Sequence, residues 1–395
     1  MEIFPRTTEP MNKTISEQVF DYALKVFVVL STFFYMSVPN GNINPIEWNY
    51  QVQELFFRYG TILLFGFSLF SAPKRRFESR SLGFFIVYAC ISSFLFNFEL
   101  GVRRVILNIF FGLLFYQMVY ERIRLDELKK YVSWLFWILV ANLGLCFFQW
   151  FDNDLIFNHV NHSIVPISEL VCGFMRLQAS LGILAALIGP VLFIIHPLTA
   201  LVALPLMFWG KSSISIAGFV AAVAFISWFR IERWKWFLLA GVVFVAGASY
   251  IVLFDMPSGQ FDERFKIWNQ ALKVVLSSSP YTGMSLGSFA KWEPLQTQAT
   301  NNMKLGWIWA HNEYIQTFFE MGIIGITGLF FYFKGRFKDI RESLSIPDVQ
   351  VLSGFMISLM IISFAQFPFH AAKLVVLCLF LMATLHSKAK EDYLA

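Results

Sequence analysis

Apolar runs of about 20 residues recur from one end of this chain to the other. A run of that length, wound as an α-helix, is long enough to cross the hydrocarbon core of a bilayer. The chain has 395 residues, of which 57% are hydrophobic and only 14% are charged. Soluble proteins usually carry about 25% charged residues. The sequence therefore predicts an all-α fold, a polytopic integral membrane protein with a single membrane domain over residues 1–395.

The lengths of the apolar runs predict about twelve transmembrane helices, of which the seventh is short. They are expected at residues 19–38, 55–72, 81–98, 102–120, 131–150, 179–195, 198–210, 213–229, 236–254, 312–333, 350–367 and 371–386. Clusters of Lys and Arg at 74–80, 122–130, 230–235 and 334–341 fall on alternate connections. Because cytoplasmic loops carry an excess of these residues, we expect those connections and both termini in the cytoplasm. No cleavable signal peptide is expected.

The longest connection, residues 255–310, joins the ninth and tenth predicted helices and is expected on the outer side of the membrane. Within it, the segment FDERFKIWNQALKVVLSSS places Phe261, Phe265, Trp268, Leu272 and Val275 at helical spacing. This pattern predicts an amphipathic helix on or near the membrane surface, ended by three serines and a proline.

Directly after this connection comes the segment WIWAHNEYIQTFFEMGIIGITGLFFYF at residues 307–333. It predicts an unbroken membrane-length helix in which Asn312, Gln316 and Glu320 form one polar stripe. Gly322, with the glycines at 325 and 328, is expected to form a smooth strip for helix packing. A carboxylate one to two turns inside an apolar helix is unfavourable, so Glu320 is a candidate functional residue. A structural pair for Glu320 is the alternative, and we favour it.

Several arginines depart from the bias toward the cytoplasmic side: Arg58, Arg103, Arg104, Arg176 and Arg264 are all expected near the outer face. Arginine binds phosphate oxygens through two parallel hydrogen bonds and stays charged at any relevant pH. These residues are therefore candidates for holding a lipid-linked phosphate or pyrophosphate. Interfacial anchoring, in which long side chains reach toward the headgroups, is the alternative for each of them.

No cofactor or metal is expected. The four cysteines are scattered without a CxxC pair, and the chain has no phosphate-binding loop or dinucleotide fingerprint. A DxD triplet at residues 152–154, followed by His159 and His162, gives only a weak indication of a divalent ion. The sequence gives no indication of nucleotide or nucleic-acid binding.

Four blocks resemble the O-antigen ligase and O-antigen polymerase superfamily. The most specific is HNEYIQTFFEMGIIGITG (311–328), which resembles the family's His-Asn signature followed by an acidic residue and Gly-x-x-Gly. RFKIWNQALKVVLSSSPYTGMSLGSF (264–289) resembles a second block, in which Ser285 stands where a glycine is common. MRLQASLGILAALIG (175–189) and WGKSSISIAGFVAAV (209–223) resemble the family's earlier arginine block and a serine-rich helix start.

The resemblance implies a metal-independent glycosyltransferase of the bacterial inner membrane whose site faces the periplasm. Such enzymes take a glycan from undecaprenyl pyrophosphate and pass it to a hydroxyl of the lipid A core, or of a second lipid-linked glycan in polymerases. By this resemblance Arg264 and Arg176 clamp the pyrophosphate. His311 is the general base or, alternatively, a hydrogen-bond donor to the pyrophosphate. Further substrate contacts are expected from Asn312, Tyr314, Trp268, Arg103, Arg104 and Glu320.

Three questions stay open at this point. A polymerase is as compatible with the sequence as a ligase. A transporter or flippase of lipid-linked anions is an alternative from a different class. Transporters typically carry ionisable residues near the midplane of the bilayer and consist of two related halves. In this chain the charges are expected near one face, and the two halves look unlike. The side chain of Trp268 offers an apolar surface to a sugar or lipid, or else anchors its helix in the bilayer.

Overall fold

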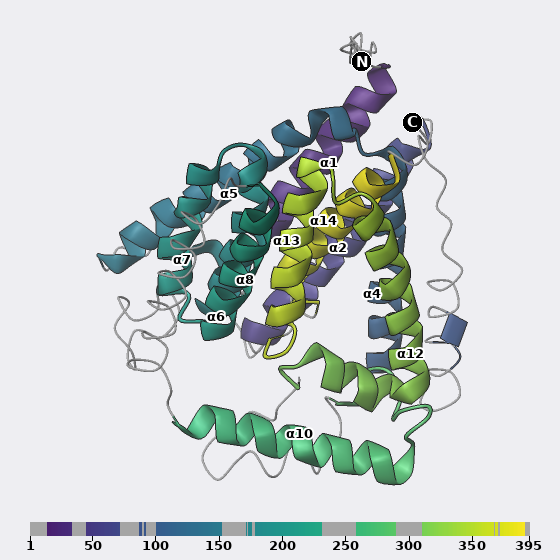
Figure 1. The fold of residues 1–395 in the computed structure, drawn as a ribbon. Coiled ribbons are helices and arrows are strands. Elements are labelled where there is room, and N and C mark those ends of the chain that lie inside the picture. The colour runs from purple at the N-terminus through teal and green to yellow at the C-terminus, as the bar shows by residue number, and fades with distance from the viewer. Residues whose placement is uncertain are drawn as a thin grey trace.

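The structure is a computed structural model that describes residues 14–33, 45–71, 87–88, 91, 100–151, 171, 173–175, 178–230, 258–289, 310–366, 368–369 and 372–391. Every regular element within these ranges is helical (Figure 1). The α-helices are α1 (Ile15–Phe33), α2 (Pro45–Ser68), α4 (Leu100–Arg122), α5 (Leu128–Trp150), α6 (Gln178–Val191), α7 (Ala203–Trp209), α8 (Ser213–Arg230), α10 (Ser258–Ser278), α12 (Glu313–Glu342), α13 (Pro347–Ile362) and α14 (Ala372–Glu391). The predicted all-α fold is confirmed for these ranges.

Most of the predicted helices coincide with observed ones to within a few residues, as α4, α5 and α8 illustrate. Helix α2 begins at Pro45, earlier than the expected 55. The short seventh segment is a 3-10 helix, Pro197–Val202, that continues into α7. The predicted spans 81–98 and 236–254 lie almost wholly outside the described residues. The count of twelve spans and the orientation of the chain stay predictions.

By length and apolar composition, one helical stretch of the described chain, Leu125–Trp150, is able to cross a membrane on its own. Four shorter apolar helical stretches accompany it: Ala179–Ile194, Pro197–Trp209, Ser213–Phe229 and Pro347–Ile362. These lengths and compositions agree with a membrane protein.

Helix α13 lies in the middle of the bundle, where it packs against α6, α8 and α14. Its contact with α8 is close because glycines face larger neighbours: a Cβ on Gly218 would lie 3.0 Å from the backbone oxygen of Ser358. The hydroxyl of Ser358 donates a hydrogen bond of 2.9 Å to the carbonyl of Ala186 in α6. Small residues at crossing points are the usual means by which helices approach closely in membranes.

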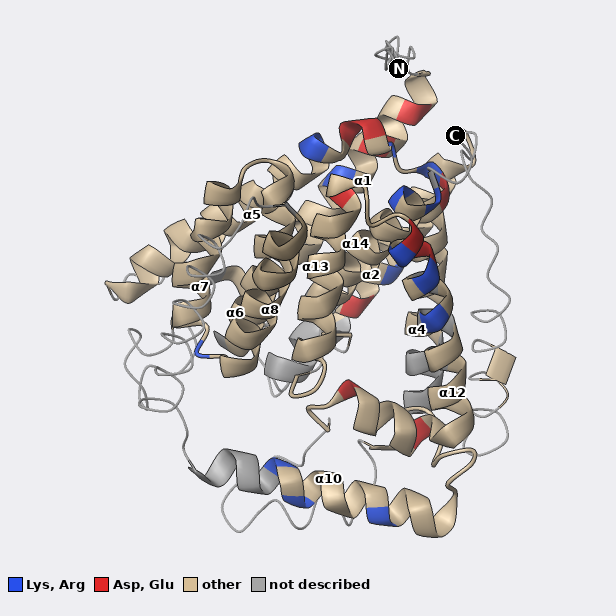
Figure 2. Ribbon diagram, viewed as in Figure 1, with Lys and Arg blue, Asp and Glu red and all other residues tan. Residues whose placement is uncertain are grey.

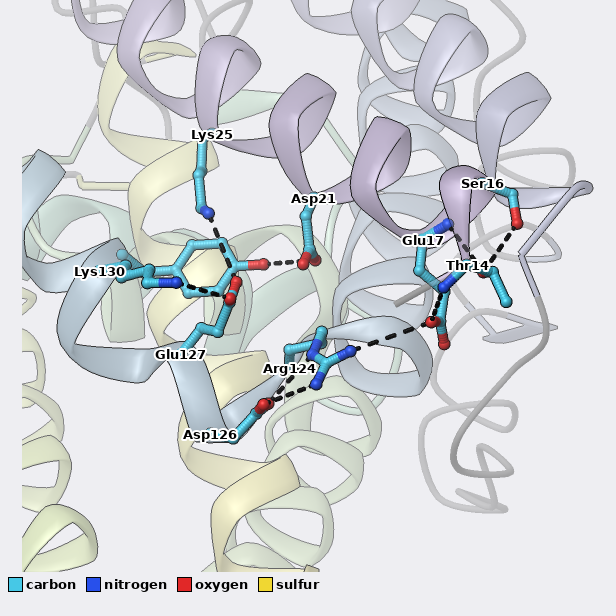
Figure 3. A network of polar contacts seen from close by, with 10 residues as sticks. Thr14, Ser16, Glu17, Asp21, Lys25, Arg124, Asp126, Glu127 and Lys130 are labelled. Carbon is cyan, nitrogen blue, oxygen red and sulfur yellow. Dashed lines mark hydrogen bonds and ion pairs between the residues drawn. The ribbon is translucent and has the colours of Figure 1, made fainter. Parts of the chain in front are cut away.

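A network of charged and polar side chains fixes one end of the bundle (Figure 3). It joins Glu17, Asp21 and Lys25 of α1 to Arg124, Asp126 and Glu127 just before α5 and to Lys130 and Tyr131 in its first turn. The hydroxyl of Tyr131 donates to Asp21 at 2.7 Å, and Lys130 donates to Glu127 at 2.9 Å. The connection between α4 and α5 is thereby held on α1, at the end where α14 also finishes (Figure 1).

The opposite end of the bundle carries α10 and the first part of α12, which lie across the ends of the other helices (Figure 1). Between the two ends, α6, α8 and α13 show almost no charge over their length (Figure 2). Basic residues lie on α10, and acidic residues lie on the first part of α12 above it (Figure 2). Charged residues of the His-Asn block and of α10 therefore lie at the same end of the bundle.

Candidate active site

Helix α10 supplies the first residue of the site. Ile267, Ala271 and Val275, spaced four residues apart, form a buried stripe that packs in one cluster with Phe319 of α12. This stripe fixes the rotation of α10 and leaves Arg264 beside it at the N-terminal end of the helix. The predicted helix is confirmed. Its exposed face, which includes Phe265, is predicted to rest on a bilayer, and that remains a prediction.

The loop that carries His311 is held by its neighbours on both sides. The indole Nε1 of Trp268, one turn beyond Arg264, donates a hydrogen bond of 2.6 Å to the carbonyl of Ala310. The amide of Ala310 donates to the side-chain oxygen of Gln316 at 3.2 Å. His311 itself has φ 51°, in the left-handed region that non-glycine residues rarely adopt. Such backbone strain persists only where the surroundings enforce it, and it is common at functional sites.

The turn at residues 363–366, directly after α13, brings Arg264 and His311 together. The Nη1 of Arg264 donates to the carbonyl of Ala365 at 3.1 Å. The side chain of Gln366 forms a hydrogen bond with His311. The turn is attached to α12 as well, because the amide of Glu313 donates to the carbonyl of Ser363 at 2.9 Å. Three segments that are distant in the sequence therefore meet at one point.

The electrostatics of this cluster keep the imidazole neutral. Burial and the positive charge of Arg264 together lower the pKa of His311 to about 3, although the hydrogen bond with Gln366 acts in the opposite direction. Burial also lowers the pKa of Arg264, which stays protonated at physiological pH because guanidinium groups do not lose their proton in proteins. A neutral imidazole beside a fixed cation is able to accept a proton while an anion is bound next to it.

Arg264 has hydrogen-bonding capacity left for such an anion. Its Nε is buried and has no partner among the described residues. The bond to Ala365 uses Nη1, so Nε and Nη2 remain as the two donors of one edge of the guanidinium. Two parallel donors on one edge match two oxygens of a phosphate group.

Helix α12 is broken, and the prediction of an unbroken helix was wrong. Gly322 has φ 60° and ψ −163°, a conformation essentially restricted to glycine. Residues 313–321 lie across the end of the bundle, and the remainder of α12 runs along it (Figure 1). Gly322 is thus not part of a helical glycine strip. The two helix ends at the break leave backbone donors and acceptors that need partners.

The turn after α10 supplies those partners. The carbonyls of Pro280 and Tyr281 accept hydrogen bonds from the amides of Ile323 and Ile324, at 2.9 Å and 3.1 Å. The amide of Met284 donates to the carbonyl of Phe319 at 2.8 Å in return. The approach is so close that a Cβ on Gly322 would lie 2.5 Å from the backbone of Tyr281. The turn after α10, which lies in the 264–289 block, therefore supplies hydrogen-bond partners to the backbone of α12 at its break.

The remaining predicted residues take structural positions in the described chain. Asn312 caps α12, since its side-chain oxygen accepts from the amides of Tyr314 and Ile315 at 3.0 Å each. The hydroxyl of Tyr314 donates to the carbonyl of Met360 in α13 at 3.1 Å. Glu320 is buried and accepts from Gln316 at 3.2 Å, so this pair of the predicted polar stripe is present. Substrate contacts by Asn312, Tyr314, Trp268 and Glu320 stay predictions.

Three predicted arginines cannot be placed by their side chains. Arg103 and Arg104 lie in the first turn of α4, but their side chains are outside the description, and Arg176 lies outside it altogether. Arg58 is described: its Nε donates to Asn108 of α4 at 2.9 Å, and its Nη2 lies 3.3 Å from Glu54. This position ties α2 to α4.

Two residues at the site were missed by the sequence analysis. Glu313 is buried, and its carboxylate accepts a hydrogen bond of 2.9 Å from the amide of Phe369. Gln366 is 7% exposed and bonds His311. A signal for Gln366 was available, because it is the polar residue near the end of the predicted span 350–367. The sequence around Gln366, however, gives no sign that its side chain contacts His311, which is 55 residues away in the chain.

Part of the chain matches a known protein family. Residues 198–330 match the family model described as O-antigen ligase. Over these 133 of the 395 residues, the chain is similar to the O-antigen ligase family. The match covers both Arg264 and His311 and confirms the resemblance to the O-antigen ligase and polymerase superfamily. Arg176 and Gln366 lie outside the O-antigen ligase match, on either side of it. A comparison with curated proteins found no match.

Proposed function

We propose that this protein is a glycosyltransferase of the bacterial inner membrane that moves a glycan from undecaprenyl pyrophosphate to the lipid A core, as an O-antigen ligase does. One observation carries the proposal: Arg264 and His311, which both lie inside the family match but are distant in sequence, are brought together by the turn at 363–366. The site lies at one end of the bundle, and the C-terminus of α14 lies at the other end (Figure 1). In the predicted topology the end that carries the site faces the periplasm.

In this proposal a hydroxyl oxygen of the acceptor attacks the anomeric carbon of the glycan. The bond from that carbon to the pyrophosphate oxygen breaks, and undecaprenyl pyrophosphate leaves. His311 takes the proton of the hydroxyl, and Arg264 donates two hydrogen bonds to the pyrophosphate as its charge grows. A single displacement inverts the anomeric configuration. None of these steps requires a metal.

The experiment that tests the function compares a deletion strain with strains complemented by the wild-type gene, His311→Ala or Lys266→Ala. Lipopolysaccharide is analysed on gels beside the pool of undecaprenyl-linked glycan. We expect deletion and His311→Ala to give bare lipid A core with long glycan retained on the carrier. Lys266→Ala is the matched control, because Lys266 is exposed on the same helix as Arg264. It should restore the wild-type pattern.

The same experiment separates the alternatives. Core that carries a single repeat would replace the ligase assignment by a polymerase. An unchanged lipopolysaccharide profile would overturn both, and a loss of carrier-linked glycan from the periplasmic leaflet would indicate a transporter. Transfer by the purified protein in nanodiscs, from carrier-linked glycan to lipid A core, then shows whether the chain acts without a further protein.

A further inference from the structure

The turn at residues 363–366 is built as a rigid extension of α13. The amides of Phe364 and Ala365 donate to the carbonyls of Ile361 and Ile362 at 3.1 Å each, and that of Gln366 donates to Ile362 at 2.9 Å. The ring of Phe364 lies against that of Tyr314, with centroids 4.7 Å apart. The turn is therefore held both by the helix before it and by α12. A group mounted on it has a defined position.

Gln366 lies on this turn, and its side chain contacts His311. Its side chain is 7% exposed and forms a hydrogen bond with the imidazole. This bond favours the protonated ring, as expected when a ring N–H donates to the oxygen of the amide. A neutral imidazole has one N–H and one lone pair, so a partner for the N–H decides which nitrogen presents the lone pair.

On the basis of the proposed transfer function, we propose that Gln366 is a positioning residue: it holds His311 in the tautomer and orientation in which the ring accepts the proton of the acceptor hydroxyl. The residue acts through His311 and does not itself touch the reacting atoms. The same turn positions Arg264, but through the backbone carbonyl of Ala365. Substitution of the Gln366 side chain should therefore affect His311 and leave Arg264 in place.

The choice of a neutral amide follows from the charges around His311. Arg264 of α10 acts on the ring electrostatically, and Glu313 of α12 is its charged neighbour along the chain, with its carboxylate turned to the amide of Phe369. A carboxylate at position 366 would stabilise the imidazolium and raise the pKa of His311, so that less of the ring would be neutral at a given pH. An amide orients the ring without adding a charge.

The test uses Gln366→Leu and Gln366→Glu in the full-length protein in nanodiscs, with transfer measured as kcat and KM for the carrier-linked glycan. Gln350→Leu is the matched control. Gln350 is also a buried amide, 8% exposed; it lies at the start of α13, at the other end of that helix from the turn that carries Gln366, and donates to the carbonyl of Leu344 at 2.8 Å. Both leucine variants lose one buried hydrogen bond of similar kind, so their effects on the melting temperature should be similar.

For Gln366→Leu we expect kcat to fall about 10- to 100-fold, part of the 10²–10⁴-fold that a general base supplies, with KM for the donor nearly unchanged. For Gln366→Glu we expect the acid limb of the profile of kcat/KM against pH to move to higher pH, because the carboxylate stabilises the imidazolium. Gln350→Leu should change neither quantity. A purely structural role for Gln366 would lower stability without moving the pH profile.

Two results separate failure of this proposal from failure of the proposed function. If His311→Ala is inactive while Gln366→Leu has the kcat and pH profile of Gln350→Leu, the positioning role is refuted and the function stands. If His311→Ala retains wild-type transfer, the proposed function fails, and the role of Gln366 fails with it.

Discussion

Gly322→Ala tests the broken form of α12 most directly. At φ 60° and ψ −163°, an alanine is strained by about 1–3 kcal/mol. Its Cβ would lie 2.5 Å from the backbone of Tyr281 and Gly283, and displacing a packed backbone costs roughly another 1–3 kcal/mol. Together these effects amount to roughly 2–6 kcal/mol, a large fraction of the 5–15 kcal/mol by which a folded domain is usually stable. We expect a much lower melting temperature.

Gly335→Ala is the matched control for this measurement. Gly335 lies in the same helix, and a Cβ added there would meet nothing within 4 Å. In a regular helical position, alanine is favoured over glycine by up to about 1 kcal/mol, so this variant should melt at or above the wild-type temperature. Both proteins are compared by thermal unfolding in one detergent. Equal melting temperatures for the two variants would show that α12 runs straight through Gly322 and that the turn after α10 does not fill a break.

Four further predictions concern three single side chains. Arg264→Lys should lower the rate of transfer by two or more orders of magnitude, because a point charge loses the paired donors, and a near-wild-type rate would refute the clamp. Burial and Arg264 lower the pKa of His311 to about 3 from an ordinary 6.5, so kcat/KM should stay constant from neutral pH down to about pH 5. A fall in kcat/KM centred near pH 6.5 would contradict the burial of the ring. The same lowered pKa means that the stability contributed by the neutral ring is present above 6.5 and is lost as the pH falls toward 3, which acid titration of unfolding would show. Ser285 has φ 83° and a buried hydroxyl without a partner in the described chain, so Ser285→Gly should stabilise the protein by about 1 kcal/mol in thermal unfolding, and a destabilised variant would show that the hydroxyl has a use.

The helices themselves were predictable because their determinants are local. An apolar run of membrane length defines a helix by its own composition, and α4, α5 and α8 lie where such runs lie. The start of α12 is also local, since Asn312 is a good capping residue immediately before an apolar-periodic segment. The position of the His-Asn block at the end of a helix therefore followed from the sequence alone.

The break in α12 was not predictable, because its cause lies in another segment. The partners of Ile323 and Ile324 are the carbonyls of Pro280 and Tyr281, which belong to the turn after α10. Read by itself, Gly322 in an apolar helix resembles a packing residue, as glycines in membrane helices often are. The role of Gln366 was hidden for the same reason, since only the tertiary structure brings the end of α13 to His311.

The capping of α12 explains why the proposed anion site depends on an arginine. A helix N-terminus is usually a ready site for phosphate, since its first amides point outward without partners. Here those amides are occupied: Glu313 donates to the carbonyl of Ser363, and the next two amides donate to the side chain of Asn312. The helix dipole still favours negative charge near His311, but the amides that would bind the oxygens are used to hold the loop in place. Direct hydrogen bonding to a pyrophosphate then falls to Arg264, whose Nε is left without a partner in the described chain. The backbone at this end of α12 thus fixes the geometry, and the guanidinium provides the binding, which is why Arg264→Lys is expected to fail even though it keeps the charge.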